Sequence, residues 1–199
     1  MIVLLAALSA SAAAGMRIAL PLLLIGLLQG SDLWNGVPVL KHIQPPVVIG
    51  VLVSWSLFEA FASKKLLGQR ALQIVQLIFS PAVGAIMAMA IAVKLTALTG
   101  WNLRLLGLVG GLLALVLQLV QMGWFYRLRG LPTWAVFGLD GLCMLLVLFA
   151  FNAPRQGGII ALLLLWLAIR SVQEWQRWYV AQANPADRAS PRRHKQDPD

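Results

Sequence analysis

The chain has 199 residues, of which 60% are hydrophobic and only 12% are charged. Soluble domains are about 45 to 50% apolar and about 25% charged, so this composition excludes a soluble globular fold and places the chain in a bilayer. A net charge of +9 at pH 7 would suggest nucleic acid as the partner of a soluble protein. Here the basic residues lie mostly in short segments between apolar runs, which is a pattern of membrane topology. We therefore expect a lipid bilayer around the chain and no nucleic-acid partner.

Apolar stretches of membrane length recur along the chain. A hydrocarbon core about 30 Å thick needs about 20 apolar residues for each helical span. Such stretches lie at residues 2–29, 46–62, 71–93, 103–122, 133–151 and 158–180. The sequence thus predicts an all-α polytopic membrane helix bundle of about six spans. We expect residues 1–183 to form one transmembrane domain and residues 184–199, rich in Pro and charge, to form a disordered cytoplasmic tail.

Two of these stretches are interrupted at mid-depth. The interruptions are Gly15, Arg17 and Pro21 in the first stretch, and Ser80, Pro81 and Gly84 in the third. Irregular backbone at bilayer depth is tolerated only where protein or water lines it. We therefore expect the first and third helices to be broken or kinked, with breaks at Gly15, Pro21, Ser80, Pro81 and Gly84.

The basic residues give a prediction of topology. If each stretch crosses the membrane once, ten Lys and Arg residues fall on one side and four on the other. The positive-inside rule then places the richer side, with both termini, in the cytoplasm. If both interrupted stretches instead return to their starting side, the same count becomes six against eight and the bias is lost. We favour six full crossings.

Two charged residues lie inside apolar stretches. With a rise of 1.5 Å per residue, Arg17 is more than about 20 Å from the predicted cytoplasmic start of its helix. Asp140 lies about 12 Å into the fifth stretch and is the natural counter-ion, although the two nominal depths differ by roughly 10 Å. Arg17 either coordinates an anion or gates a path, or it is a packing residue. Asp140 is either half of a structural ion pair or a proton or cation site.

A third group of polar residues lies near the predicted cytoplasmic end. Glu59 ends the second stretch, and Gln73 and Gln76 begin the third at similar depth. Glu59 either couples to an ion or is solvated and paired with Lys64 or Lys65. The amides either join a polar site or hold neighbouring helices together by hydrogen bonds, as amides do in many bundles.

No catalytic or metal-binding motif is present. The single Cys143 leaves no Cys-based metal site, and His42 and His194 are far apart in the sequence. The patterns of serine hydrolases, phosphate-binding loops, zinc sites and dinucleotide sites are also missing. We expect no metal, no cofactor and no enzymatic activity.

Three short blocks carry a resemblance to a known family. They are Ser11-Ala-Ala-Ala-Gly-Met-Arg-Ile-Ala-Leu-Pro21, then Glu59-Ala-Phe-Ala-Ser-Lys64, then Gln76 with Ser80-Pro81-Ala-Val-Gly84. In these blocks, across residues 5–90, the chain resembles the bacterial membrane family catalogued as domain of unknown function 4126. Ser63 stands where that family often has Asp before the Lys. The resemblance implies an integral protein of a bacterial plasma membrane or thylakoid, and it implies no activity.

Two functions fit these observations. The first is a transport or permeation unit for a small solute or ion, with a polar path lined by Arg17, Glu59, Gln76 and Asp140. The second is a non-transporting membrane scaffold or assembly factor, in which the same residues hold the bundle together. A direct pair of Arg17 with Asp140 in a dry bundle would favour the scaffold, and a hydrated cavity around them would favour transport. Homo-oligomerisation and a further membrane protein partner both stay open.

Overall fold

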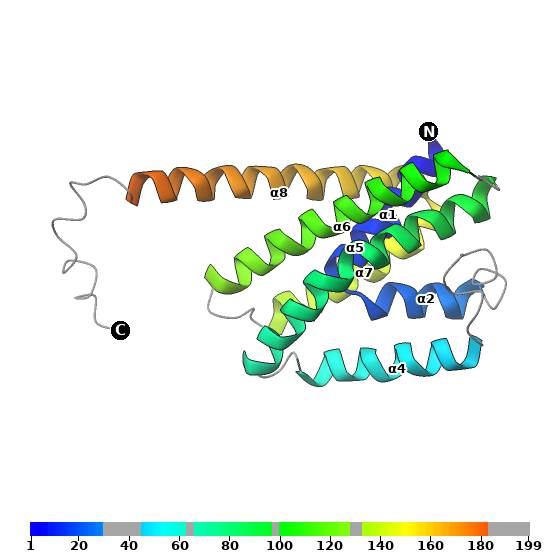
Figure 1. Cartoon of the computed structure of the whole chain (residues 1–199), viewed down its shortest axis with the longest axis horizontal. Coiled ribbons are helices and arrows are strands. Elements are labelled where there is room, and N and C mark those ends of the chain that lie inside the picture. The colour runs from blue at the N-terminus through cyan, green and yellow to red at the C-terminus, as the bar shows by residue number, and fades with distance from the viewer. Residues whose placement is uncertain (30–44, 63–65, 97–99, 128–132, 183–199) are drawn as a thin grey trace.

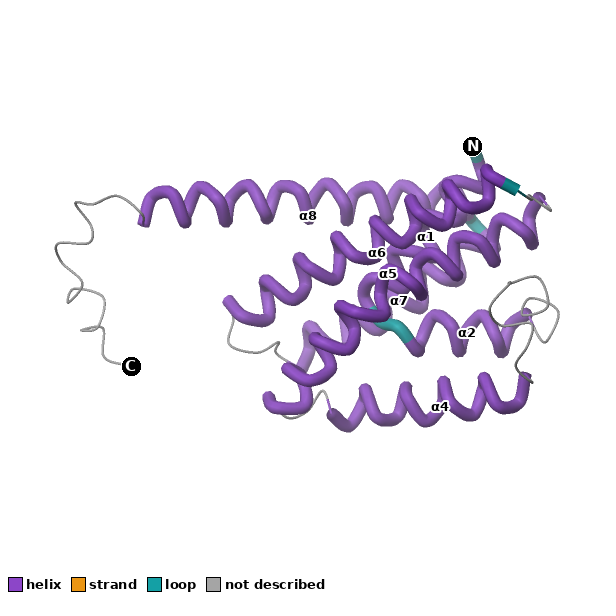
Figure 2. Tube along the Cα trace, viewed as in Figure 1, coloured by secondary structure: helices purple, strands orange, loops and turns teal. Residues whose placement is uncertain are grey.

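The computed structural model describes residues 1–29, 45–62, 66–96, 100–127 and 133–182, which form helices and no strand (Figures 1 and 2). Four helices are long and apolar enough to cross a membrane, and they cover the last four predicted spans to within a few residues. The all-helical membrane bundle is thereby confirmed, whereas the predicted tail at 184–199 lies outside the described residues. The helices are α1 Ile2–Met16, α2 Ala19–Gln29, α4 Pro45–Ala62, α5 Leu66–Thr96, α6 Trp101–Arg127, α7 Thr133–Asn152 and α8 Pro154–Gln182.

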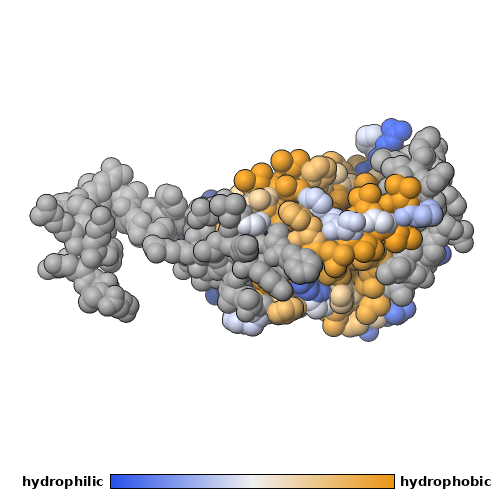
Figure 3. Space-filling view, turned by 90° about the horizontal axis from the view of Figure 1, so that it is seen from below, coloured by the Kyte–Doolittle hydropathy of each residue, from blue (hydrophilic) through white to orange (hydrophobic). Residues whose placement is uncertain are grey.

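The outer surface of the bundle is apolar. Large side chains such as Leu108, Trp134 and Phe137 are exposed, and most of the surface that is coloured by hydropathy in Figure 3 is hydrophobic. The interior combines small and polar side chains with larger apolar ones such as Ile91 and Leu146. This distribution is expected in lipid, because lipid tails are as apolar as Leu and helices associate through close packing and hydrogen bonds instead.

Helix α1 is the centre of the bundle and packs against α5, α6, α7 and α8. Its residues 6–16 are all buried, and most of them are Ala, Ser or Gly. Small side chains let the four surrounding helices approach closely. Ser9 Oγ donates a hydrogen bond to the Leu146 carbonyl oxygen at 2.7 Å, and Ser11 Oγ donates to the Gly84 carbonyl oxygen at 3.0 Å. These bonds attach α1 to α7 and α5.

The first apolar stretch is broken between α1 and α2, as predicted. The break lies two residues after Gly15, where Arg17 has an extended backbone with φ −143° and ψ 140°. Pro21 sits in the first turn of α2, where a missing N–H costs little. Its ring occupies the place of the hydrogen bond that would join it to the Arg17 carbonyl in a continuous helix. Pro21 therefore starts the second half rather than forming the break.

The two halves of this stretch run in opposite directions. In Figure 1, α1 runs from the N-terminus to the middle of the bundle, and α2 returns towards the end from which α1 started. The 15 residues of α1 span about 22 Å, which is less than a bilayer core. The first stretch is thus a re-entrant hairpin, and α4 to α8 run between the two ends.

The course of the first stretch thus differs from the predicted full crossing, whereas the position of both termini in the cytoplasm stays a prediction. Met1 and the end of α8 lie at opposite ends of the bundle (Figure 1). The count of basic residues could not reveal this, because no Lys or Arg precedes Arg17 and the count is the same when the first stretch alone re-enters.

The third stretch does not break. Helix α5 runs without interruption from Leu66 to Thr96 and contains Pro81. Pro81 has no N–H for the carbonyl one turn earlier, but the helix continues on both sides. Gly84 serves close packing instead, since a Cβ there would overlap Ala114 and approach the Gly110 carbonyl oxygen within 2.9 Å. The third helix is thus not broken at Ser80, Pro81 or Gly84 but packs tightly on α6, and the alternative of a kink at these residues stays a prediction.

Candidate functional site

A salt bridge lies at the break of the first stretch. Arg17 Nε contacts Asp140 Oδ1 of α7 at 2.6 Å, and the two side chains are 9% and 28% exposed. The nominal depth mismatch of roughly 10 Å shrinks because α1 and α7 start at opposite ends of the bundle (Figure 1). Arg17 lies about 22 Å from one end and Asp140 about 12 Å from the other, so in a core about 30 Å thick their depths differ by only about 4 Å. The predicted ion pair between them is thus present.

A second polar group joins α4, α5 and α6. Glu59 Oε1 accepts hydrogen bonds from Trp55 Nε1 at 3.0 Å and from Gln76 Nε2 at 3.1 Å. Gln118 Nε2 on α6 lies 3.1 Å from Gln73 Oε1 and 3.4 Å from Gln76 Oε1. The carboxyl and the three amides are nearly inaccessible, with exposed fractions of 1 to 5%. These side chains form a continuous hydrogen-bonded chain across three helices.

Glu59 makes no ion pair with any residue that the structure describes, and its hydrogen-bond donors there are uncharged. Lys64 and Lys65, the partners considered from the sequence, lie outside the described residues. Arg17 and Asp140 act on the Glu59 carboxyl through their charges, so the two polar groups are electrostatically linked.

Three buried oxygen atoms lack a hydrogen-bond partner within the described ranges: Ser56 Oγ, Ser80 Oγ and Gln121 Oε1. Each lies one helical turn from a member of the Glu59 chain. Ser56 precedes Glu59 on α4, Ser80 follows Gln76 on α5, and Gln121 follows Gln118 on α6. Buried polar atoms without a protein partner are where ordered water or ions bind in many proteins. The polar chain is therefore bordered by acceptors that could coordinate water or a cation.

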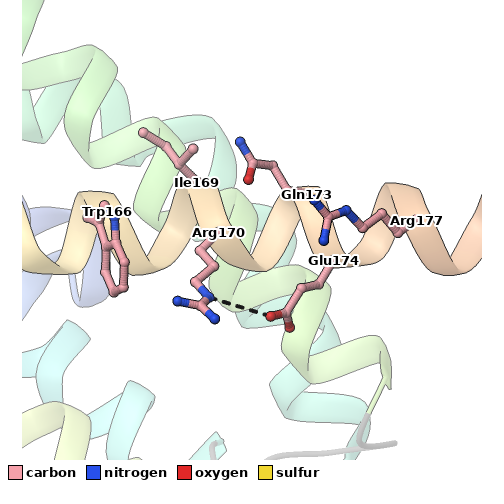
Figure 4. Close-up of a pocket in the computed structure, with 6 residues that line it drawn as sticks. All are labelled: Trp166, Ile169, Arg170, Gln173, Glu174 and Arg177. Atoms are coloured by element: carbon pink, nitrogen blue, oxygen red, sulfur yellow. Dashed lines mark ion pairs between the residues drawn. The ribbon is translucent and has the colours of Figure 1, made fainter.

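Other polar features are less suited to a site. Within the described ranges, no three His, Cys, Asp or Glu residues gather as metal ligands. On α8, Arg170 lies 5.4 Å over the Trp166 ring and 3.6 Å from Glu174 (Figure 4). Both members of this ion pair are more than 60% exposed. This face therefore forms a solvated helical surface, as the three-to-four spacing of its charges predicts.

The family model described as domain of unknown function 4126 matches residues 4–174. The chain belongs to this family. No curated protein and no solved structure matches it.

The blocks that carry the resemblance to the domain of unknown function 4126 family come together around the polar groups. Arg17 from the first block lies at the break, and Glu59 from the second block is hydrogen-bonded to Gln76 from the third. Ser11 and Gly84 join the first and third blocks through a hydrogen bond. In this family member, three stretches far apart in the sequence thus build one region of the fold.

The four residues of the predicted path all lie in these two polar groups: Arg17, Glu59, Gln76 and Asp140. The sequence analysis missed Trp55, which donates a hydrogen bond to Glu59. The signal was present, since Trp55 precedes Glu59 by four residues and side chains at that spacing meet on a helix. Gln118 also makes interhelical hydrogen bonds to α5.

Proposed function

We propose that this membrane protein is a permeation unit for a small ion, with protons or a small cation moving past Glu59. The observation that supports this best is the Glu59 carboxyl itself, 4% exposed and held by the uncharged donors Trp55 and Gln76. Burying a charged carboxylate that only neutral donors contact costs free energy. Binding a proton or a cation would remove that cost, so such a carboxyl is suited to bind and release either one.

The surroundings of Glu59 support a path rather than an isolated site. Gln76 and Gln118 continue the polar chain towards α6, and the charges of Arg17 and Asp140 act on the Glu59 carboxyl. The break between α1 and α2 ends two half-helices inside the membrane, and such ends carry backbone groups that bind ions in many transporters. The helices are packed closely, so the permeating species must be small. The proposal includes no catalytic step.

The test is ion flux in liposomes for Glu59→Gln and for Glu174→Gln. Both changes remove one carboxylate from a helix, but Glu174 lies in the exposed pair on α8. We expect wild type and Glu174→Gln to carry protons, sodium or potassium, and Glu59→Gln to lose most of the flux while keeping its circular dichroism spectrum. Equal flux from both folded variants, or no flux from folded wild type, would refute the proposal.

The second candidate function is a non-transporting scaffold. The observation in its favour is the direct 2.6 Å contact of Arg17 with Asp140, which is what a purely structural ion pair requires. A scaffold predicts no flux in wild type. It also predicts that substitutions which disturb the helix packing abolish binding of a partner or a second copy, whereas a substitution of Glu59 does not.

We further propose that the end of the bundle where α5 and α7 begin faces the cytoplasm, in a bacterial plasma membrane or thylakoid. The positive-inside rule supports this, because the sequence assigns ten of the Lys and Arg residues to the loops and tail on that side and four to the other. The N-terminus then lies outside. Cys143 is the single cysteine, so a Cys143→Ala background with one new cysteine at position 2 or 177 can be labelled in intact cells. An impermeant maleimide should label position 2 only, and the reverse pattern would contradict this orientation.

A further inference from the structure

A groove lies on α8 where the apolar part of this helix ends. Its volume is about 510 Å³, within the range of about 300 to 1,000 Å³ that is typical of small-molecule sites. The described residues that line it all belong to α8, and all are exposed: Trp166, Ile169, Arg170, Gln173, Glu174 and Arg177 (Figure 4). Their spacing of three and four residues puts them on one side of the helix.

This groove lies at the edge of the hydrocarbon core. The candidate span of α8 runs from Pro154 to Glu174. At 1.5 Å per residue, Arg170 lies about 24 Å and Arg177 about 35 Å from Pro154, on either side of the end of a core about 30 Å thick. The polar headgroup layer begins at that level. Because this layer is hydrated, the exposed charges of the groove stay solvated while they lie within reach of lipid phosphates.

Two arginine side chains of the groove can bind a phosphate. Arg177 makes no ion pair with any described residue, and in Figure 4 its side chain runs back along the helix towards Gln173. Arg170 lies 3.6 Å from Glu174, which is too far for a hydrogen bond, so its N–H groups can still bind another acceptor. Guanidinium groups suit phosphate oxygens through paired N–H bonds. Two arginines and one glutamate give the groove a net charge of +1, which one lipid phosphate neutralises.

An apolar strip leads from the groove into the hydrocarbon region. Leu162 precedes Trp166 by one turn and lies on the same side of α8 as the groove. Leu162, Trp166 and Ile169 are 46 to 53% exposed. A soluble anion would contact only the charged part of this surface. A phospholipid would contact both parts, because its phosphate and its acyl chain follow each other in the same order as the arginines and the apolar strip.

We propose that this groove binds one anionic phospholipid, whose phosphate contacts Arg170 and Arg177 and whose acyl chain lies along Trp166 and Leu162. A zwitterionic phospholipid has no net charge and would leave the groove at +1, whereas an anionic one neutralises it. This binding site is on α8, separate from the path around Glu59 on α4, and does not rest on the proposed ion flux.

The test compares two photoreactive phospholipids with the same acyl chains: phosphatidylglycerol, which is anionic, and phosphatidylethanolamine, which has no net charge. Each is added at low mole fraction to the full-length protein in phosphatidylcholine nanodiscs, and the cross-linked peptides are mapped by mass spectrometry. One basic charge near a membrane surface strengthens the binding of an anionic lipid about fivefold. We therefore expect phosphatidylglycerol to label residues 162–169 about fivefold more than phosphatidylethanolamine does.

A matched pair of arginines separates the groove from a general effect of charge. Arg177→Gln and Arg155→Gln each remove one exposed positive charge from α8, but only Arg177 lines the groove. We expect Arg177→Gln to lose the preference for phosphatidylglycerol and Arg155→Gln to keep it, with circular dichroism as the check on folding. Glu174→Gln should strengthen the preference about fivefold, because it removes the opposing charge.

Equal labelling of residues 162–169 by the two lipids in wild type would overturn the proposal. Equal losses in Arg177→Gln and Arg155→Gln would overturn it as well, because the preference would then follow net charge alone. So would loss of the phosphatidylglycerol label in potassium phosphate but not in potassium chloride of the same ionic strength, since a soluble anion would then be the occupant.

Discussion

Separating Arg17 from Asp140 should destabilise the bundle more than any change to an exposed ion pair. Asp140→Asn removes the only acidic partner that Arg17 has among the described residues. Breaking a buried pair by removing one partner costs about 3 to 5 kcal/mol. Since Asp140 is 28% exposed, we expect the lower end of that range, about 3 kcal/mol.

A double-mutant cycle measures the interaction between the two side chains. Arg17→Met, Asp140→Asn and the double variant are unfolded with sodium dodecyl sulfate in mixed micelles and followed by circular dichroism. We expect the double variant to lose less stability than the two single variants together, with a coupling of about 1 to 3 kcal/mol. The matched control is Arg170→Met with Glu174→Gln, a 3.6 Å pair with both side chains more than 60% exposed. Its coupling should stay below about 1 kcal/mol.

Additive losses would refute this reasoning. If the effects of Arg17→Met and Asp140→Asn sum to within about 0.5 kcal/mol of the double variant, the contact does not stabilise the hairpin and another interaction must hold the break in place. Flux measured on the same variants then separates the two candidate functions. A folded double variant with wild-type flux would restrict the pair to a structural role.

Three further predictions concern packing and hydrogen bonds. Gly110→Ala should destabilise the bundle by about 1 to 3 kcal/mol, because its Cβ would overlap neighbouring side chains. Gly123→Ala is the control and should be neutral or stabilising, because a Cβ there meets nothing within 4 Å; equal shifts of the thermal midpoint would contradict this. Cys143 is 0% exposed and should react with N-ethylmaleimide only after unfolding, so fast labelling of folded protein would disprove its burial. Gln118→Leu leaves two acceptors on α5 without their donor and should lower the free energy of unfolding in detergent by about 1 to 2 kcal/mol. Gln173→Leu on the exposed face of α8 should have little effect, and a larger loss for Gln173→Leu than for Gln118→Leu would exclude the amide chain as a stabilising element.

The sequence predicted the spans well because the bilayer itself sets their length and composition. Stretches such as 103–122 and 133–151 contain enough apolar residues to cross, and helices α6 and α7 follow them closely. The direction in which a short apolar helix runs does not change its amino-acid composition. Residues 2–29 have the same hydropathy whether they cross or return, so the re-entry of the first stretch required the packing of the whole bundle.

The polar site was predicted in part for similar reasons. A charge such as Arg17 within an apolar stretch requires a partner, and Asp140 was the natural candidate. The side-chain network around Glu59 depends on which faces of α4, α5 and α6 meet. Residue spacing alone does not define those faces, because helices surrounded by lipid and other helices are apolar nearly all round. Trp55 was recognisable only from its spacing to Glu59.

The central position of α1 has a consequence for how the protein is made. The ribosome synthesises α1 before α5 to α8, yet these four later helices enclose it. With about 22 Å of length, α1 cannot cross the bilayer alone, and its serine hydroxyls find acceptors such as the Leu146 carbonyl only on later helices. This segment must therefore wait at or near the membrane until the helices around it have been inserted. Assembly of the bundle is completed when this early segment moves to the centre of helices made after it.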